Sequence, residues 1–212
     1  MTPSPPPPRR RNAGIAIVLL CSGAGCGLLR GPTITPTEFY VLSALPQATD
    51  RPGDAREIVL GLGPVTLPPY LNRPEMASRV APNQLRFDEF NRWAEPLKDN
   101  FFNVLATELD AQLGLERIVR YPWYSTTTMD YVVVVAVQRF EAQPSGEVTL
   151  DARWGIGDGK GTTLANRDSH FSRPGGSPAV VAAAMSALVS DLAGEIATAL
   201  QQTSTTRRPH KS

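Results

Sequence analysis

Cysteine and histidine are scarce in this 212-residue chain, and their positions exclude several kinds of site. The only two cysteines, Cys21 and Cys26, lie in the first thirty residues, so a disulfide or a thiolate metal site in the body of the protein is excluded. The only two histidines are His170 and His210, and the second lies in the polar C-terminal tail. A histidine-based metal site or a catalytic histidine pair needs more than one histidine in the body of the chain. We therefore predict no metal, no bound cofactor and no enzyme activity.

Charge of one sign is not in excess either. Lysine and arginine total 21 against 20 aspartate and glutamate, which gives a formal net charge of +1. A protein that binds nucleic acid neutralises phosphates with a basic excess, so nucleic acid is excluded as a partner. Hydrophobic residues make up 42% of the chain and charged residues 19%, enough apolar material for one folded domain with tails.

The N-terminus has the layout of a secretory signal. Three arginines, Arg9–Arg11, precede an apolar run from Ala13 to Leu20, and small residues follow. Ser22 and Gly23 interrupt the run before it reaches the about 20 apolar residues that a membrane-spanning helix needs. We expect this segment to direct export of the chain without remaining as a transmembrane span.

The segment Ser22–Cys26 resembles the lipobox of bacterial lipoproteins, in which small residues let a signal peptidase cut directly before a cysteine. The resemblance implies that residues 1–25 are a lipoprotein signal peptide and that Cys26 is lipidated. Residues 26–37, rich in Gly, Pro and Thr, would then form a tether between the lipid and the domain.

Gly27, directly after the cysteine, resembles the sorting pattern for delivery to the outer membrane, which implies the periplasmic face of that membrane. Cys21 is a rival lipidation site, but the large Leu20 before it does not suit the cleavage position. The alternatives are an uncleaved anchor or a free thiol in an ordinary signal peptide.

The body contains several runs typical of strands. Residues 39–42 and 57–62 are rich in β-branched and aromatic residues, and extended structure restarts at Ile118–Tyr121. Tyr131–Phe140 is apolar at both alternating sets of positions, which predicts a central strand covered on two sides. Val148–Trp154 alternates apolar with polar residues, so that strand has one wet face.

Two stretches have the period of a helix. Trp93–Leu113 carries one apolar stripe, with Pro96 in its first turn and Gly114 as its stop. The second helix begins with Ser177 as N-cap and continues to about Leu200, before the polar tail 203–212. We expect the following acids to complement the dipole of the first helix: Asp88, Glu89, Glu95 and Asp99.

This order of elements predicts an α+β fold, a mostly antiparallel sheet with two long helices packed on it. Prolines between positions 64 and 74 exclude a helix there and leave at best an irregular strand. The aromatic residues that border the strands are expected to fill the core; these are Tyr121, Trp123, Tyr124 and Tyr131.

Two motifs that suggest chemistry fail on inspection. Gly155–Thr162 is glycine-rich, but three residues separate its first glycine from the Gly-Lys pair, where a phosphate-binding loop needs four. We predict a hairpin turn there. The hydroxyl cluster Ser125–Thr128 has no general base in a recognisable context, so it is interpreted as an ordinary loop.

Four sequence motifs, in this order along the chain, decide which family the protein resembles: residues 39–42, 61–74, 92–97 and 121–123. Together with the lipobox, they resemble the PqiC/YmbA family of ABC-type transport auxiliary lipoproteins. The similarity assigns residues 38–202 to the family's domain and implies a fold like the N-terminal domain of TolB. It leaves 203–212 as a flexible tail.

The resemblance implies an accessory and docking subunit of an MCE-type ABC lipid transport system that maintains the envelope. Its partners would be a periplasmic MCE-domain protein, the inner-membrane transport complex, outer-membrane lipid and a ring of identical subunits. For docking we single out a rigid, aromatic and arginine-containing set. These residues are Pro68, Tyr70, Leu71, Arg73, Arg92, Trp93 and Glu95.

Other roles remain open at this point. Trp93 and Pro96 would also serve to fix the start of the helix against the sheet. The protein as a whole would alternatively be a periplasmic carrier that binds lipid in a pocket between helix and sheet, or a lipoprotein that activates a cell-wall synthase.

Overall fold

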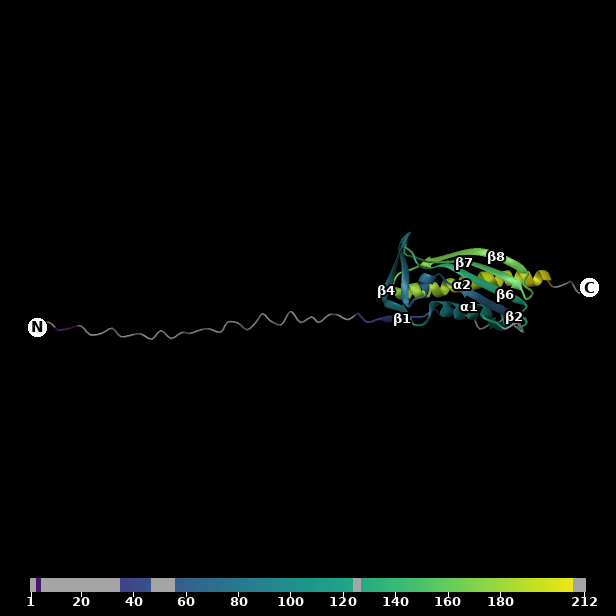
Figure 1. Ribbon diagram of the computed structural model, residues 1–212, viewed down its shortest axis with the longest axis horizontal. Coiled ribbons are helices and arrows are strands. Elements are labelled where there is room, and N and C mark those ends of the chain that lie inside the picture. Colours follow the sequence, from purple (N-terminus) through teal and green to yellow (C-terminus); the bar gives the residue numbers. More distant parts are fainter. Residues whose placement is uncertain (1–2, 5–34, 47–55, 124–126, 208–212) are drawn as a thin grey trace, which may run out of the picture. The chain divides into compact units, whose positions relative to one another are not determined.

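The computed structural model describes residues 3–4, 35–46, 56–123 and 127–207, and the part from Pro36 onward is one compact unit (Figure 1). Cys26, the signal peptide and most of the tether lie outside the described residues. The elements in order are β1 (Glu38–Tyr40), β2 (Arg56–Thr66), the 3-10 helix η1 (Pro69–Leu71), β3 (Glu75–Ala81), β4 (Gln84–Trp93), α1 (Leu97–Leu113), β5 (Leu115–Arg120), β6 (Tyr131–Ala142), β7 (Glu147–Asp158), β8 (Thr163–Pro174) and α2 (Pro178–Arg207).

The strands form one eight-stranded mixed sheet built around β6. On one side β6 pairs antiparallel with β7 along its length, and β7 pairs antiparallel with β8. On the other side β6 pairs with β2 over its first half and with β3 at its last residue. The order on that side is β1-β4-β3-β6-β2-β5. The predicted α+β class is confirmed, since the long antiparallel ladders dominate the sheet.

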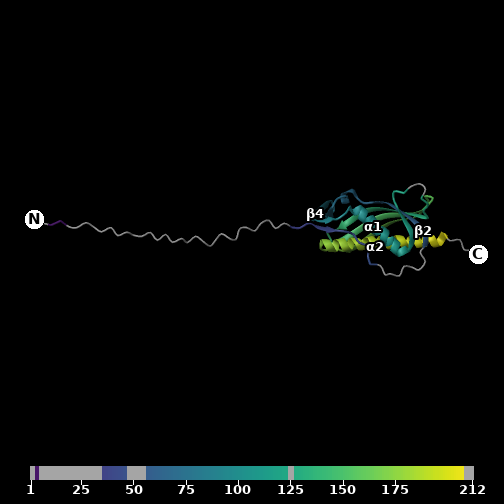
Figure 2. The same ribbon diagram turned by 90° about the horizontal axis from the view of Figure 1, so that it is seen from below.

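Both helices lie on the same face of the sheet, as Figure 2 shows. The core therefore forms between that face and the helices, and the inward positions of β6 and β7 are buried in it. The prediction that β6 is covered on two sides is wrong: Val134 points away from the helices and is 40% exposed. The fold has two layers, so the second apolar face of β6 has no layer of its own to cover it.

Helix α1 begins at Leu97, four residues later than expected, because β4 continues through Trp93 and Pro96 takes the N-cap position. Gly114 ends the helix in the left-handed conformation, φ 58°, as predicted. Of the acids assigned to the helix dipole, Asp88 and Glu89 lie in β4 instead, Glu95 precedes the helix, and Asp99 alone is in its first turn.

Helix α2 begins after Ser177 as predicted, with the Val181 N–H donating to the Ser177 carbonyl. It extends to Arg207, five residues beyond the expected domain end at position 202. By length and composition, Pro178–Ser204 could cross a membrane, but half of that window is buried within the fold. It is the central helix of the core, in contact with α1, β7 and β8.

The proline-rich segment is more regular than predicted. Strand β2 continues through Pro64 to Thr66, with a shift in register between Leu62 and Val65. Gly63 lies at this irregularity with φ 117°, where a Cβ would lie 2.6 Å from the Cβ of Tyr121. The expectation of no helix is corrected at Pro69–Leu71, because prolines are tolerated in a first turn and this 3-10 helix is a single turn.

Candidate docking site

The turn that contains η1 is fixed to the sheet by a buried carboxylate. Glu141, near the end of β6, has no exposed surface. The Tyr70 hydroxyl donates to Glu141 Oε2 at 2.6 Å, and Arg79 Nε on β3 donates to Glu141 Oε1 at 2.9 Å. Burial, and then the hydrogen bond to Glu141, raises the pKa of Tyr70. Leu71 completes the attachment with its side chain in the core, 4% exposed.

Directly after this turn, two arginines from different elements meet on one carboxylate. Arg73 Nε lies 3.0 Å from one oxygen of Glu75, and an Arg92 terminal nitrogen lies 2.6 Å from the other. Glu75 and Arg92 are partners in the register of β3 and β4. We call Arg73, Glu75 and Arg92 the arginine cluster.

The electrostatics of the arginine cluster favour the ionised form of Glu75. The hydrogen bond from its own backbone N–H has the largest effect and lowers the pKa of Glu75. Burial opposes it, and hydrogen bonds from Arg92 and Arg73 then bring the pKa below its ordinary value. The Arg73 guanidinium also lies 3.8 Å from the centre of the Phe87 ring, which restricts its rotamers through a cation–π contact. With two guanidinium groups on one carboxylate, the cluster has donors left for a carboxylate on a partner.

The structure separates the predicted docking residues into two groups. Arg73 and Arg92 come together on the surface, with side chains 42% and 35% exposed. Trp93 is buried in the core at 4% exposure, and its backbone N–H donates to the Pro74 carbonyl, so its side chain is not part of the exposed surface. Glu95 is exposed.

Pro68, Tyr70 and Leu71 hold the turn and present little surface of their own. The sequence prediction missed Glu75 and Glu141, the acids on which both networks depend. Glu141 finds its arginine on another strand, and Glu75 joins its neighbour Arg73 to Arg92 only through the pairing of β3 with β4.

The segment that follows β1 is bound across both helices by side chains that the sequence prediction also missed. Asn100 on α1 accepts the Leu42 N–H and donates to the Leu42 carbonyl. Further along, the Leu45 N–H donates to Glu108 on α1 at 2.6 Å, and the Ser43 N–H donates to Ser186 on α2 at 3.1 Å. These contacts attach the N-terminal end of the domain to its helical layer.

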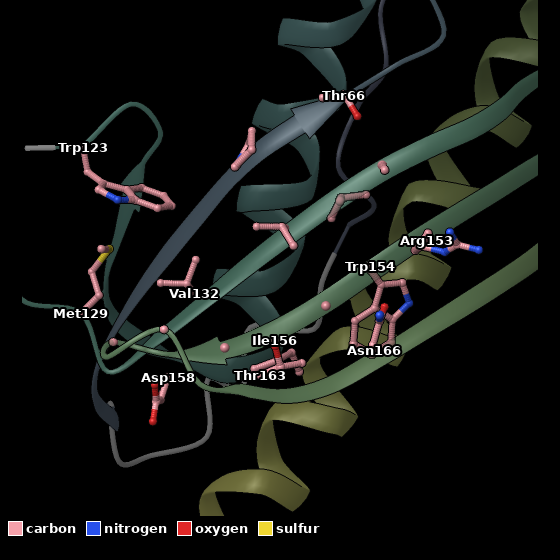
Figure 3. Close-up of a pocket in the computed structure, with 18 residues that line it drawn as sticks. Thr66, Trp123, Met129, Val132, Arg153, Trp154, Ile156, Asp158, Thr163 and Asn166 are labelled. Atoms are coloured by element: carbon pink, nitrogen blue, oxygen red, sulfur yellow. The ribbon is translucent and has the colours of Figure 1, made fainter.

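Among the described residues, two spaces lie between the helices and the sheet. A cleft of about 420 Å³ lies between the first half of α1 and strands β2 and β5, lined by residues that include Thr66, Phe102 and Arg120. A void of about 10 Å³ lies among side chains that include Leu60, Leu113 and Leu200. A cleft of about 650 Å³ lies on the opposite, helix-free face of the sheet (Figure 3). The alternative of a lipid carrier stays a prediction, since the cleft beside α1 lies between helix and sheet as that role requires. No group of acidic, histidine or cysteine side chains among the described residues could hold a metal ion.

The aromatic residues predicted for the core divide between two environments. Tyr131 is buried, whereas Tyr121 is 52% exposed and Trp123 lines the outer cleft. Tyr121 and Trp123 pack edge to face, with ring centres 5.2 Å apart. Tyr124 lies outside the described residues. The expectation is thus correct for Tyr131 and wrong for Tyr121, because the chain leaves the sheet at the end of β5.

A model of the ABC-type transport auxiliary lipoprotein component family matches residues 40–197, which is most of the chain and nearly all of the described domain. The chain belongs to this family. The family's description is that of an auxiliary lipoprotein component of an ABC-type transporter.

Two solved structures support the fold. Protein XCC0632 from Xanthomonas campestris, of family DUF330, is 20% identical and superposes with a TM-score of 0.65, covering 79% of this chain and 99% of its own. An uncharacterized protein, also 20% identical, gives a TM-score of 0.63 and covers 78% and 99% of the two chains. At these identities the likeness establishes the fold alone. No curated protein matches the chain.

Proposed function

We propose that the protein is an outer-membrane-anchored periplasmic lipoprotein that acts as the docking subunit of an MCE-type ABC lipid transport system. Membership of the transport auxiliary lipoprotein family supports the coarse assignment. The predicted signal peptide and lipidation of Cys26 support the anchor, and the resemblance of the four sequence motifs supports the MCE-domain partner and the inner-membrane complex.

The arginine cluster is the observation that carries the docking role. It combines exposed guanidinium groups with a turn that is fixed to the sheet. Tyr70 of η1 donates a hydrogen bond to buried Glu141, and the Arg73 guanidinium packs on the Phe87 ring. A surface fixed before binding loses little conformational entropy on association. Arginine is also enriched among the residues that dominate binding energy at interfaces.

The tether defines how the docking surface would be used. A lipid on Cys26 would hold the domain at the membrane, and an anchored domain meets its partner at a raised effective concentration. Modest affinity per subunit is then sufficient, and a ring of identical subunits around one partner would multiply it. We expect an acidic surface on the MCE-domain protein opposite the arginine cluster.

The test is a charge reversal in the cluster, Arg73→Glu, in the full-length lipoprotein expressed in its native envelope. We expect the variant to fold like the wild type by circular dichroism and to lose co-purification with the MCE-domain protein. Arg86→Glu is the matched control, because Arg86 is an exposed arginine on the same β3–β4 hairpin, outside the cluster. Retained binding by Arg73→Glu, or equal loss by both variants, would contradict the assignment.

A further inference from the structure

The cleft on the helix-free face lies where a two-layer fold normally presents polar side chains to water. Its floor is instead apolar along β6, with Val132, Val134 and Ala136 pointing outward. The walls add Trp123 and Met129 on the side of the β5–β6 connection. Figure 3 shows these two side chains at one end of the cleft. We call this cleft the outer slot.

The register of β6 and β7 explains why the outer slot is hollow. Val132 pairs with Gly157 and Val134 pairs with Gly155, so each valine has a neighbour without a side chain. The next outward pair is Ala136 with Arg153. The slot therefore follows the strands for four residues, about 13 Å at the rise of a strand, and a guanidinium stands at its end.

The dimensions restrict what can occupy the outer slot. The two strands that flank the glycines of β7 are β6 and β8, about 10 Å apart at normal strand spacing. Side chains on those strands narrow the space, so a helix of about 10 Å diameter does not fit. A peptide strand laid on this face would bury backbone N–H and C=O groups against side chains that cannot pair with them. A single alkyl chain has no such groups.

The volume of the outer slot also favours a small ligand over a protein partner. About 650 Å³ is within the range of small-molecule pockets, which are mostly apolar with a few polar groups that fix orientation. A stable protein interface needs roughly 800 Å² from each partner, more than one slot along two strands offers. The slot thus has the size of a ligand site and not of a subunit contact.

Arg153 supplies the charge complementarity for one class of ligand. Asp168 on β8 takes two of its five N–H donors, at 2.8 and 3.2 Å, and both side chains are mostly exposed. The other donors can bind an anionic group at the end of the slot. In Figure 3 the Arg153 side chain lies at the opposite end from Trp123 and Met129.

From these observations we infer that the outer slot binds a single-chain anionic amphiphile. The alkyl chain lies between the outward valines of β6 and the glycines of β7, and the anionic headgroup lies at Arg153. This site is independent of the arginine cluster, which is built from β3, β4 and the turn after η1. Failure of either proposal leaves the other standing.

The test uses the quenching of tryptophan emission by 12-bromododecanoic acid, whose heavy atom lies at the end of the chain opposite the carboxylate. The protein is the full chain with Cys26→Ala, so that no anchor lipid competes. We expect saturable quenching that is largely lost in Trp123→Phe, because Trp123 lies at the end of the slot away from Arg153. Replacing the acid by 12-bromododecanol, or Arg153 by alanine, should weaken binding several-fold.

Two variants block the slot in different ways. Val134→Asp places a charge on its floor and Ala136→Phe fills it, and we expect each to weaken binding at least about tenfold. Val180→Asp is the matched control, because Val180 on α2 is a valine of similar exposure, 46% against 40% for Val134. The Val180→Asp variant should bind the acid like the parent protein. Circular dichroism and a urea midpoint check the fold of each variant.

Any of four results would overturn the inference. The first three are quenching that does not saturate, quenching that persists in Trp123→Phe, and binding that is unchanged in folded Val134→Asp and Ala136→Phe. A fourth is a fall in oligomeric state with Val134→Asp in a protein that does not bind the acid, which would assign the slot to a contact between copies of the chain. Arg73→Glu should leave the quenching unchanged.

Discussion

Removing the Arg79 cation should destabilise the whole domain while leaving its surface almost unaltered. Arg79→Met keeps an aliphatic side chain on β3, but it removes the guanidinium that pairs with the buried carboxylate of Glu141. Glu141 has no exposed surface, so water cannot replace the guanidinium. Breaking a buried ion pair from one side typically costs about 3–5 kcal/mol.

We therefore expect Arg79→Met to lower the free energy of unfolding by about 3–5 kcal/mol. The assay is urea unfolding followed by circular dichroism. Because η1 depends on the same carboxylate through Tyr70, the variant should also weaken docking through Arg73.

A second variant separates this account from simple loss of packing. Arg79→Met combined with Glu141→Gln removes both charges and leaves an amide oxygen that can still accept the Tyr70 hydroxyl. We expect the double variant to recover at least half of the lost stability. A loss below about 1 kcal/mol in Arg79→Met, or a double variant that is the less stable of the two, would refute the reasoning.

Three further predictions concern single side chains. Because the pKa of Tyr70 is raised in the folded state, the unfolded chain loses the Tyr70 proton above about pH 10 while the folded chain retains it, so the free energy of unfolding declines as the pH rises. In Tyr70→Phe, urea midpoints should decline less between pH 8 and pH 11 than in the wild type. Equal declines would count against the buried hydrogen bond. Trp93→Ala should cost about 3–5 kcal/mol in urea unfolding, as expected of a large buried side chain, and a loss below 1 kcal/mol would return Trp93 to the docking surface. Asn100→Ala should cost about 1–3 kcal/mol and raise amide exchange at Leu42, whereas unchanged exchange would mean that the segment after β1 is held by other contacts.

Elements with one apolar face could be predicted from the sequence. Val148–Trp154 and the two helices have a clear period, and the stop at Gly114 follows from its freedom at positive φ. Strand β8 gave no such signal because its inward side chains are mixed: Arg167, Ser169 and Arg173 are polar, whereas Ala165 and Phe171 pack against the core. Arg173 pairs with Asp191, and Ser169 bridges Trp154 and Glu195, so the strand attaches to α2 through ion pairs and hydrogen bonds.

The candidate sites were harder to predict because they depend on register. Arg73 and Arg92 were selected from the sequence as separate residues, but their meeting on Glu75 results from the pairing of β3 with β4. The outer slot was missed for a related reason. An apolar alternate face on β6 indicates cover by a second layer, and here it faces glycines of the neighbouring strand across an open cleft.

The central claim, docking of a lipid-anchored subunit onto a transporter, is tested most directly by one purification. The protein is tagged at its C-terminus and extracted from native envelopes in mild detergent, and mass spectrometry identifies its N-terminal residue and the proteins that accompany it. The account predicts an acylated Cys26 as the first residue, together with an MCE-domain protein and an ABC permease. An unprocessed N-terminus, or a lipidated protein accompanied only by cell-wall synthases, would contradict it.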